Sequence, residues 1–195
     1  MANFTKAKPS NLSRKAIEEI AESLSIAHNC TRHSALNEML EPFGGELQLR
    51  DYLQSGKTGS IEIRSKNDFD VYIPLHTSPE QDRFTVAHEL GHYVLHYLWP
   101  AHKGERTGMV YADRYGHDRA EAEANWFASA YLMPRQKVKK LWEENTRSAG
   151  AFAAHFAVST AAASHRLKRL NLLNELNPAN AEATENDAKG KSEVR

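Results

Sequence analysis

Three side chains suited to metal binding or proton transfer occur within five residues, as His-Glu-x-x-His at His88, Glu89 and His92. Residues four apart lie on one face of an α-helix, so both imidazoles can reach a single ion. Zinc suits this arrangement, because a catalytic site adds a third protein ligand and a water to two His nitrogens. Glu89 lies next to the first ligand, close enough to act on that water. The spacing therefore predicts a catalytic zinc site.

The segment around this motif has the pattern of a buried helix. Apolar residues recur at helical spacing from Phe84 to Leu95, whereas a chance match would more often fall in a polar surface segment. Upstream, Ser78 is suited to be the N-cap, Pro79 the first helical residue and Gln81 the partner that closes a capping box. A helix that begins at Ser78 is therefore expected to carry the motif.

A second helix is predicted from Asp118 to Pro134, which ends it. Glu121 and Asn125 lie one turn apart on it, so Glu121 could bind zinc while Asn125 orients a ligand from outside. Two alternatives remain open. Glu121 could be a solvated carboxylate favoured by the helix dipole, and Glu123, on roughly the opposite face, is the rival third ligand.

The two motifs together resemble the ImmA/IrrE family of zinc metallopeptidases. HELGH is followed about thirty residues later by EAEANWFASAYLMP, and the similarity covers roughly residues 59–134. By this resemblance His88 and His92 match the histidine ligands, Glu89 the catalytic carboxylate and Glu121 the glutamate ligand. Tyr131 departs from the Leu usual in the family, which concerns packing rather than chemistry.

The resemblance implies a zinc-dependent endopeptidase that performs limited proteolysis of a helix-turn-helix transcriptional repressor or antitoxin, often encoded nearby, and so relieves repression. The residues alone indicate only a zinc hydrolase that acts on an amide bond. In such an enzyme Glu89 would take a proton from water and pass it to the leaving amine. The alternative is a non-catalytic regulatory or DNA- or protein-binding module with a scaffold zinc site. A retained Glu89 argues against that alternative, because a structural site needs no water-activating carboxylate.

Zinc peptidases commonly add a His or Tyr that stabilises the oxyanion. The sequence offers several candidates after the motif and does not choose between them, and each can also be a surface or packing residue. They are His96, Tyr111, Tyr115 and His117.

The remaining patterns predict an α+β fold, in which a zincin-like metallopeptidase body combines a small antiparallel sheet with the HExxH helix and the glutamate-ligand helix. The expected elements outside the two motif helices are a helix at 11–27, a short helix at 32–40, strands at 46–49, 60–63 and 69–73, and an irregular loop at 97–118. An edge strand near the metal helix could hold an extended peptide by strand addition, or it could merely cover the helix.

Two further segments have residues that could form a metal site or a DNA-binding element. His28, Cys30 and His33 cluster after the first helix, but their spacing matches no recurrent zinc pattern, so packing is the expected role of Cys30. Near residues 149–170 the pattern resembles a helix-turn-helix element. Its few basic residues, such as Arg166, favour a structural clamp or a regulator-docking surface over direct DNA binding.

These observations divide the chain into a metallopeptidase domain at 1–134, a helical, helix-turn-helix-like segment at 135–176 and a disordered tail at 177–195. Lys+Arg and Asp+Glu both number 25, so charge favours neither nucleic acid nor a membrane as main partner. The single Cys30 excludes an intramolecular disulfide. With no apolar leader or membrane span in view, a cytoplasmic protein is expected.

Overall fold

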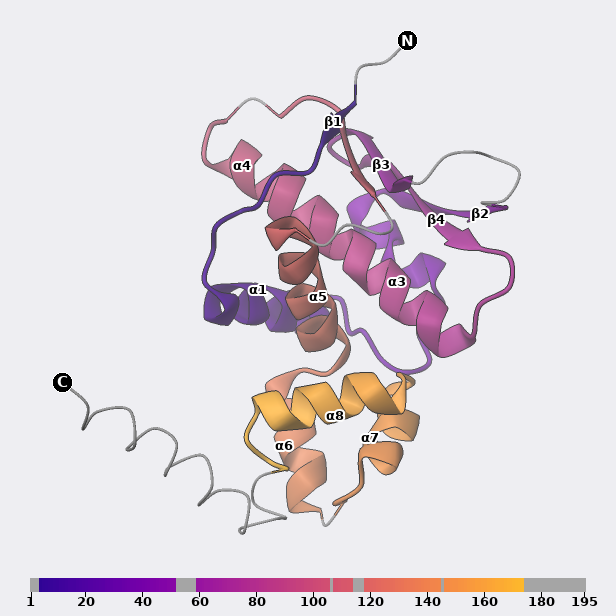
Figure 1. The fold of residues 1–195 in the computed structure, drawn as a ribbon, viewed down its shortest axis with the longest axis vertical. Coiled ribbons are helices and arrows are strands. Elements are labelled where there is room, and N and C mark those ends of the chain that lie inside the picture. Colours follow the sequence, from indigo (N-terminus) through magenta and orange to yellow (C-terminus); the bar gives the residue numbers. More distant parts are fainter. Residues whose placement is uncertain (1–3, 52–58, 106, 114–117, 145, 174–195) are drawn as a thin grey trace, which may run out of the picture.

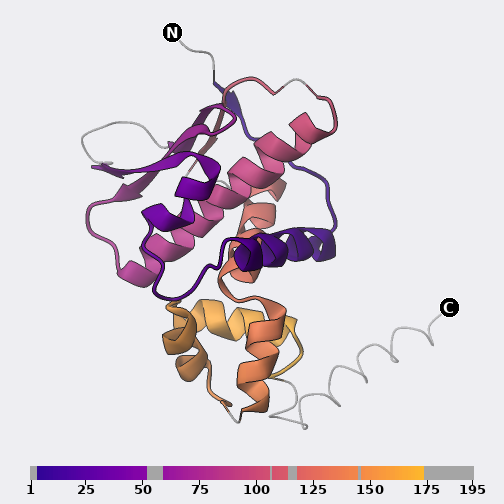
Figure 2. The ribbon, with the colours of Figure 1, turned by 180° about the vertical axis from the view of Figure 1, so that it is seen from behind.

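The computed structural model describes residues 4–51, 59–105, 107–113, 118–144 and 146–173. The fold is α+β, with a five-stranded sheet packed on helix α3 (Pro79–His92). Helix α5 (Arg119–Leu132) crosses α3 on the side away from the sheet, and α1 (Arg14–Ala27) packs on α5, as both ribbon views show (Figures 1 and 2). The predicted zincin-like arrangement of a sheet and two motif helices is therefore confirmed.

The strand order in the sheet is β1-β5-β3-β4-β2. The strands are β1 (Thr5–Lys6), β2 (Gly45–Arg50), β3 (Gly59–Ser65), β4 (Asp68–Pro74) and β5 (Val110–Asp113). Strands β3 and β4 pair antiparallel, in agreement with the expected antiparallel sheet, and the turn between them places Asn67 at φ 62°. Strand β4 ends at Pro74. In contrast, β2 pairs with β4 and β1 with β5 in parallel, so the sheet is mixed and not antiparallel throughout as expected.

The core lies between the sheet and the two motif helices. The alternation in β4 sends every second side chain inward, which gives the half-buried pattern expected from its sequence. Completely buried side chains from both layers meet there: Ile61, Ile63, Phe69, Val71, Val86, Leu90, Tyr93 and Phe127.

Two local predictions were wrong. The segment expected as one short helix at 32–40 contains only a single 3₁₀ turn, η1 (Asn37–Met39). A second turn, η2 (Glu41–Phe43), follows it and ends at Gly44 with φ 72°. The predicted loop at 97–118 is partly regular. Helix α3 continues through a π-helical segment, η3 (Tyr93–Leu98), into α4 (Trp99–His102), and β5 follows. Pro100 lies directly after the π-helical segment, where the hydrogen-bond pattern of the helix changes.

The last three helices gather at the end of the molecule away from the sheet (Figure 1). They are α6 (Arg135–Glu143), α7 (Ala149–Phe156) and α8 (Thr160–Arg169). Between α7 and α8 the chain turns at Ala157, with φ 52°, so the predicted helix-turn-helix-like pair is present. The predicted tail at 177–195 lies outside the described residues.

Helix α8 is attached to α1 by buried ion pairs. Arg166 is 1 % exposed. It donates to the Glu22 carboxylate at 2.5 Å and to the Met133 carbonyl at 2.9 Å. Arg169 donates to Glu18, which is fully buried, at 3.0 Å. These contacts attach α8 to α1, and the expectation that α8 does not read DNA stays a prediction.

Candidate metal centre

Both motif helices begin with side-chain caps that fix their first turns. In α3, Ser78 Oγ accepts the Gln81 backbone N–H at 3.3 Å, and Gln81 Oε1 accepts the Ser78 N–H at 3.2 Å. This is the capping box expected from the sequence. In α5, the Asp118 carboxylate accepts the N–H groups of Ala120 at 3.0 Å and Glu121 at 3.3 Å. Glu121 therefore lies in the first turn of a firmly capped helix.

A close approach of the two helices lets Glu121 reach the His-Glu-x-x-His face. Gly91 lies where they touch. A Cβ atom there would be 3.1 Å from Phe127 Cβ and 3.2 Å from Ala124 Cα. Both α5 residues are themselves completely buried, so they have little room to move aside. Glycine at position 91 and alanine at position 124 therefore set the spacing of the helices.

The side chains of His88, His92 and Glu121 converge on one point. The Nε2 atoms of the two histidines lie 3.1 Å apart. Glu121 Oε2 is 3.1 Å from His88 Nε2, and Glu121 Oε1 is 3.2 Å from His92 Nε2. Ligand atoms around tetrahedral zinc with bonds of about 2.0–2.2 Å lie about 3.3–3.6 Å from one another. The two nitrogens and the carboxylate are slightly closer together than this, so they fit such an ion if the side chains move apart by a few tenths of an ångström.

These residues form a group that could hold a metal ion among the described residues. The predicted cluster of His28, Cys30 and His33 does not converge in the same way. Cys30 is buried with its sulfur 3.6 Å from Arg83 Nη2, and the His28 ring packs on Phe43 with ring centroids 4.7 Å apart. This agrees with the packing role expected for Cys30.

The electrostatics of the convergent group favour metal ligation at Glu121 and His92, whereas His88 must give up a proton that its surroundings favour. Burial acts to raise the pKa of Glu121, but the hydrogen bonds with His88 and His92 outweigh it and hold that pKa at about 2. Burial lowers the pKa of His92 to about 3, so this imidazole is neutral at physiological pH. Although burial opposes it, the hydrogen bond with Glu121 and the charge of Glu89 raise the pKa of His88. A carboxylate and a neutral imidazole are the ligand forms that zinc needs.

Asn125 lies where the sequence placed it, one turn after Glu121. Its Oδ1 is 3.1 Å from His88 Nδ1. If that ring nitrogen carries the proton, the amide oxygen accepts it and Nε2 of His88 keeps its lone pair directed toward Glu121 and His92. Glu89, on α3 beside His88, is 2 % exposed.

Glu123 does not join the convergent group. Its carboxylate instead accepts hydrogen bonds from Ser10 at 2.8 Å to the backbone N–H and 2.7 Å to the hydroxyl, and from Arg119 at 2.9 Å. It also lies 3.2 Å from His96 Nε2. Burial acts to raise the pKa of Glu123, but these hydrogen bonds, His96 first, bring it to about 2. The arrangement thus favours Glu121 over Glu123 as the third ligand.

The four oxyanion candidates are placed differently. His96 is 3 % exposed, and both its ring nitrogens have partners, His92 and Glu123. Tyr111 lies in β5, where it pairs with Lys6 of β1 and Glu62 of β3. Tyr115 and His117 lie outside the described residues. Ser10 and Arg119, which donate hydrogen bonds to Glu123, were not predicted as site residues. His96 could be predicted, because its spacing of four residues from His92 places both histidines on one helix face.

Comparison with known families agrees with this geometry. The sequence matches the model of peptidase family M78, the IrrE N-terminal-like domain, over residues 35–168. The chain belongs to this family. The match extends past the two motif helices into α8, so it includes the three C-terminal helices in part or whole. Membership suggests a metal-dependent peptidase. Tyr131, where the family resemblance expected Leu, is buried and stacks on Phe127, which agrees with a packing role.

A solved structure similar to this chain is a Mycobacterium tuberculosis transcriptional regulator. It shares 19 % sequence identity with a TM-score of 0.54, covering 78 % of this chain and 46 % of that chain. At this identity the likeness concerns the fold alone, and this chain spans less than half the length of that regulator. No curated protein matches the sequence. None of the helices in the described part of the chain has the length and apolar character needed to cross a membrane.

Proposed function

We propose that this chain is a zinc-dependent endopeptidase that performs limited proteolysis of a helix-turn-helix transcriptional repressor or antitoxin, which relieves repression. The observation that supports it most is the convergence of His88, His92 and Glu121 within 3.1–3.2 Å, with Glu89 on the same helix as the two histidines. Membership of peptidase family M78 supports the same reaction class.

In this proposal, Nε2 of His88, Nε2 of His92 and a Glu121 oxygen hold the zinc. When bound, zinc would act as a Lewis acid that polarises the scissile carbonyl and would lower the pKa of a water molecule. Glu89 accepts the proton of the attacking water and passes it to the leaving amine. Its low exposure, 2 %, keeps this carboxylate out of bulk water, where its interaction with the reacting groups would be weaker.

The surface beside His88 offers a place for a substrate side chain. A cavity of about 330 Å³ is lined by Asn125, which contacts His88, and by Phe84 and Trp126. Ala162 and His165 of α8 also line it, together with the polar residues Arg14 and Ser129. An apolar or aromatic side chain of the substrate suits these aromatic walls. Because α8 lines the cavity, we infer that the C-terminal helices help to recognise the protein substrate and do not serve to bind DNA.

The sheet offers a place for the substrate backbone. Strand β1 pairs with β5 only at Val110 and Tyr111, so the β1–β5 ladder ends before Ala112. Strand β5 precedes α5, which carries Glu121, in the chain. An extended peptide could continue the sheet along this edge by strand addition. A flexible or extended segment of a regulator would fit this mode better than a folded helix.

The test uses the full chain, loaded with zinc, and the purified helix-turn-helix regulators encoded beside its gene. Mass spectrometry of the products should show one or a few cleavage sites for the wild type. Glu89→Gln should retain its zinc and lose about 10²–10⁴-fold in cleavage rate, the usual contribution of a general acid–base group. If Glu89→Gln cleaves as fast as the wild type, the peptidase proposal fails and the scaffold-site alternative takes its place.

A further inference from the structure

A line of buried polar side chains leads away from the metal centre on the side opposite to the convergent nitrogens. His92 Nδ1 lies 3.0 Å from His96 Nδ1, and His96 Nε2 lies 3.2 Å from Glu123 Oε2. The exposed fractions of the three residues are 0 %, 3 % and 0 %. Buried polar groups of this kind are costly unless each is satisfied, so the line needs a consistent set of donors and acceptors.

Only one set of proton positions satisfies every group in the line. As a metal ligand, His92 keeps a lone pair on Nε2, so its proton is on Nδ1 and is donated to His96 Nδ1. His96 then accepts on Nδ1, carries its own proton on Nε2 and donates it to the Glu123 carboxylate. A neutral His96 cannot donate from both nitrogens, so the carboxylate determines the tautomer of both rings.

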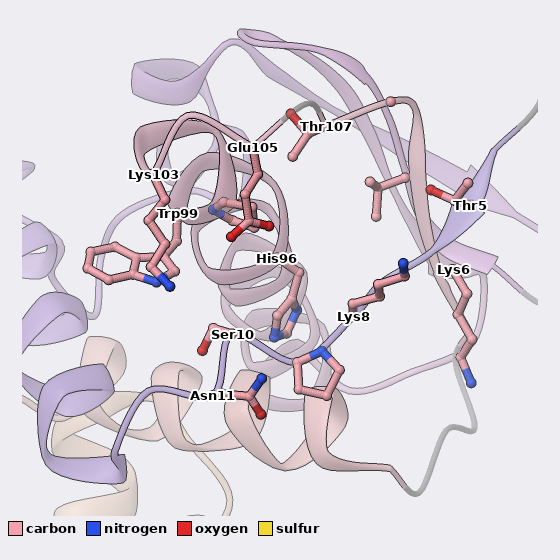
Figure 3. Close-up of a pocket in the computed structure, with 14 residues that line it drawn as sticks. Thr5, Lys6, Lys8, Ser10, Asn11, His96, Trp99, Lys103, Glu105 and Thr107 are labelled. Atoms are coloured by element: carbon pink, nitrogen blue, oxygen red, sulfur yellow. The ribbon is translucent and has the colours of Figure 1, made fainter.

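The carboxylate of Glu123 is held in place by groups from two distant parts of the chain. Ser10, in the segment before α1, donates its backbone N–H and its hydroxyl to Oε2, and Arg119 donates to Oε1 at 2.9 Å. Arg119 also donates to the Leu12 carbonyl at 3.0 Å. Ser10 and His96 both line a cavity of about 480 Å³, and Figure 3 shows them beside each other with Lys8 and Asn11. The segment before α1 therefore contacts the buried line of polar side chains at Glu123.

We propose that His96 and Glu123 are positioning residues of the metal centre: Glu123 fixes the tautomer of His96, and His96 fixes the ring and tautomer of His92. Ser10 and Arg119 anchor the carboxylate. This inference rests on the proposed function only in requiring that His92 binds a metal. It replaces the role of His96 as an oxyanion donor, because neither of its nitrogens has a proton left to donate to substrate.

Outer partners of this kind typically contribute 10- to 100-fold to metal affinity. With the full chain and a chromophoric chelator as competitor for zinc, we expect Glu123→Gln to raise the zinc dissociation constant about 10-fold and His96→Phe to raise it toward 100-fold. Gln retains an oxygen that can accept from His96, whereas Phe leaves the His92 Nδ1 proton unsatisfied. Ser10→Ala, in a partly buried segment that tolerates the change, should give a smaller increase in the same direction.

Glu18→Gln is the matched control. Glu18 is as buried as Glu123 and is also held by arginines, but it belongs to the α1–α8 contact. It should lower thermal stability without changing zinc affinity. If Glu123→Gln behaves like Glu18→Gln, with lower stability and unchanged zinc affinity, Glu123 is merely structural and the proposal is overturned.

A second measurement needs no variant. Long-range ¹H–¹⁵N correlation spectra of the zinc-loaded wild type should show His92 protonated on Nδ1 and His96 protonated on Nε2. A proton on Nδ1 of His96 would overturn the proposal. If zinc affinity and tautomers follow the expectation but no regulator is cleaved, the proposed function fails while this inference stands.

Discussion

Two buried carboxylates of this protein both bind arginine but differ in their remaining partners. Glu123, behind the metal centre, and Glu18, between α1 and α8, are both fully buried, and both bind arginines. Glu18 is surrounded by guanidinium groups, with Arg14 at 2.8 Å, Arg169 at 3.0 Å and Arg166 at 3.4 Å. Glu123 binds one arginine and gives its other oxygen to Ser10 and His96.

The comparison suggests that the buried charges around Glu18 stabilise the fold, whereas those around Glu123 orient groups of the metal centre. The carboxylate of Glu18, neutralised by several arginines, joins α1 to α8. A carboxylate with one arginine keeps an oxygen for a histidine, and through it can orient a metal ligand. Substitutions in the first region should therefore change unfolding, whereas those in the second should change zinc affinity.

The largest expected effect is on the metal side of this comparison. Glu121→Ala removes one of the three convergent groups, and we expect the zinc dissociation constant to rise by more than about 100-fold, beyond the range of outer partners. Isothermal titration or chelator competition measures it. Equal loss of affinity in Glu18→Gln would show that zinc binding reports only on folding.

In the contact between α1 and α8, Arg166→Met should lower the free energy of unfolding by about 3 kcal/mol. This is the lower end of the cost of breaking a buried ion pair, because Arg14 and Arg169 still compensate the charge of Glu18. Urea unfolding measures this. Zinc affinity of the folded protein should stay within about twofold of the wild type, because the site is built on α3 and α5. A large loss of zinc affinity would show that the two regions are coupled.

A third substitution tests the contact that joins the metal helices. Gly91→Ala places a Cβ 3.1 Å from Phe127 Cβ. The resulting overpacking should cost about 1–3 kcal/mol of stability. Because the displaced helix carries Glu121, zinc affinity should fall as well. Loss of stability with unchanged zinc affinity would mean that Glu121 does not depend on this spacing.

The smallest effect concerns pH. Although burial opposes it, Arg14, Arg166 and Arg169 hold the pKa of Glu18 below its ordinary value. A depressed folded-state pKa contributes stability that is complete above the ordinary carboxyl pKa and is lost as pH falls through the folded-state value. The melting temperature of Glu18→Gln should therefore lie below that of the wild type at neutral pH and approach it in acid. A gap that widens in acid would contradict this sign.

Features governed by local sequence were predictable. The capping box at Ser78, the helical spacing of His88 and His92 and the position of Glu121 one turn before Asn125 each depend on residues a few positions apart. The α+β class followed from the change between helical and strand periods. The role of Glu121 needed the family resemblance as well, because spacing alone left Glu123 open.

Features that depend on distant contacts were not predictable. Alternating residues fit parallel and antiparallel strands equally, so the pairing of β2 with β4 could not be read from the pattern. The helical extension through Trp99 was hidden by Pro100 and by the polar residues that follow. The contact of Ser10 with Glu123 joins residues 113 positions apart, and only the fold reveals it.

The most direct test of the account is a crystal structure of the wild type grown with zinc, with anomalous data collected at the zinc absorption edge. We predict one strong peak bound by His88 Nε2, His92 Nε2 and a Glu121 oxygen at about 2.0–2.2 Å, with Glu89 near the metal but not bound to it. A peak bound by Glu123, a site closed by Glu89 as fourth ligand, or no peak at these residues would contradict the account.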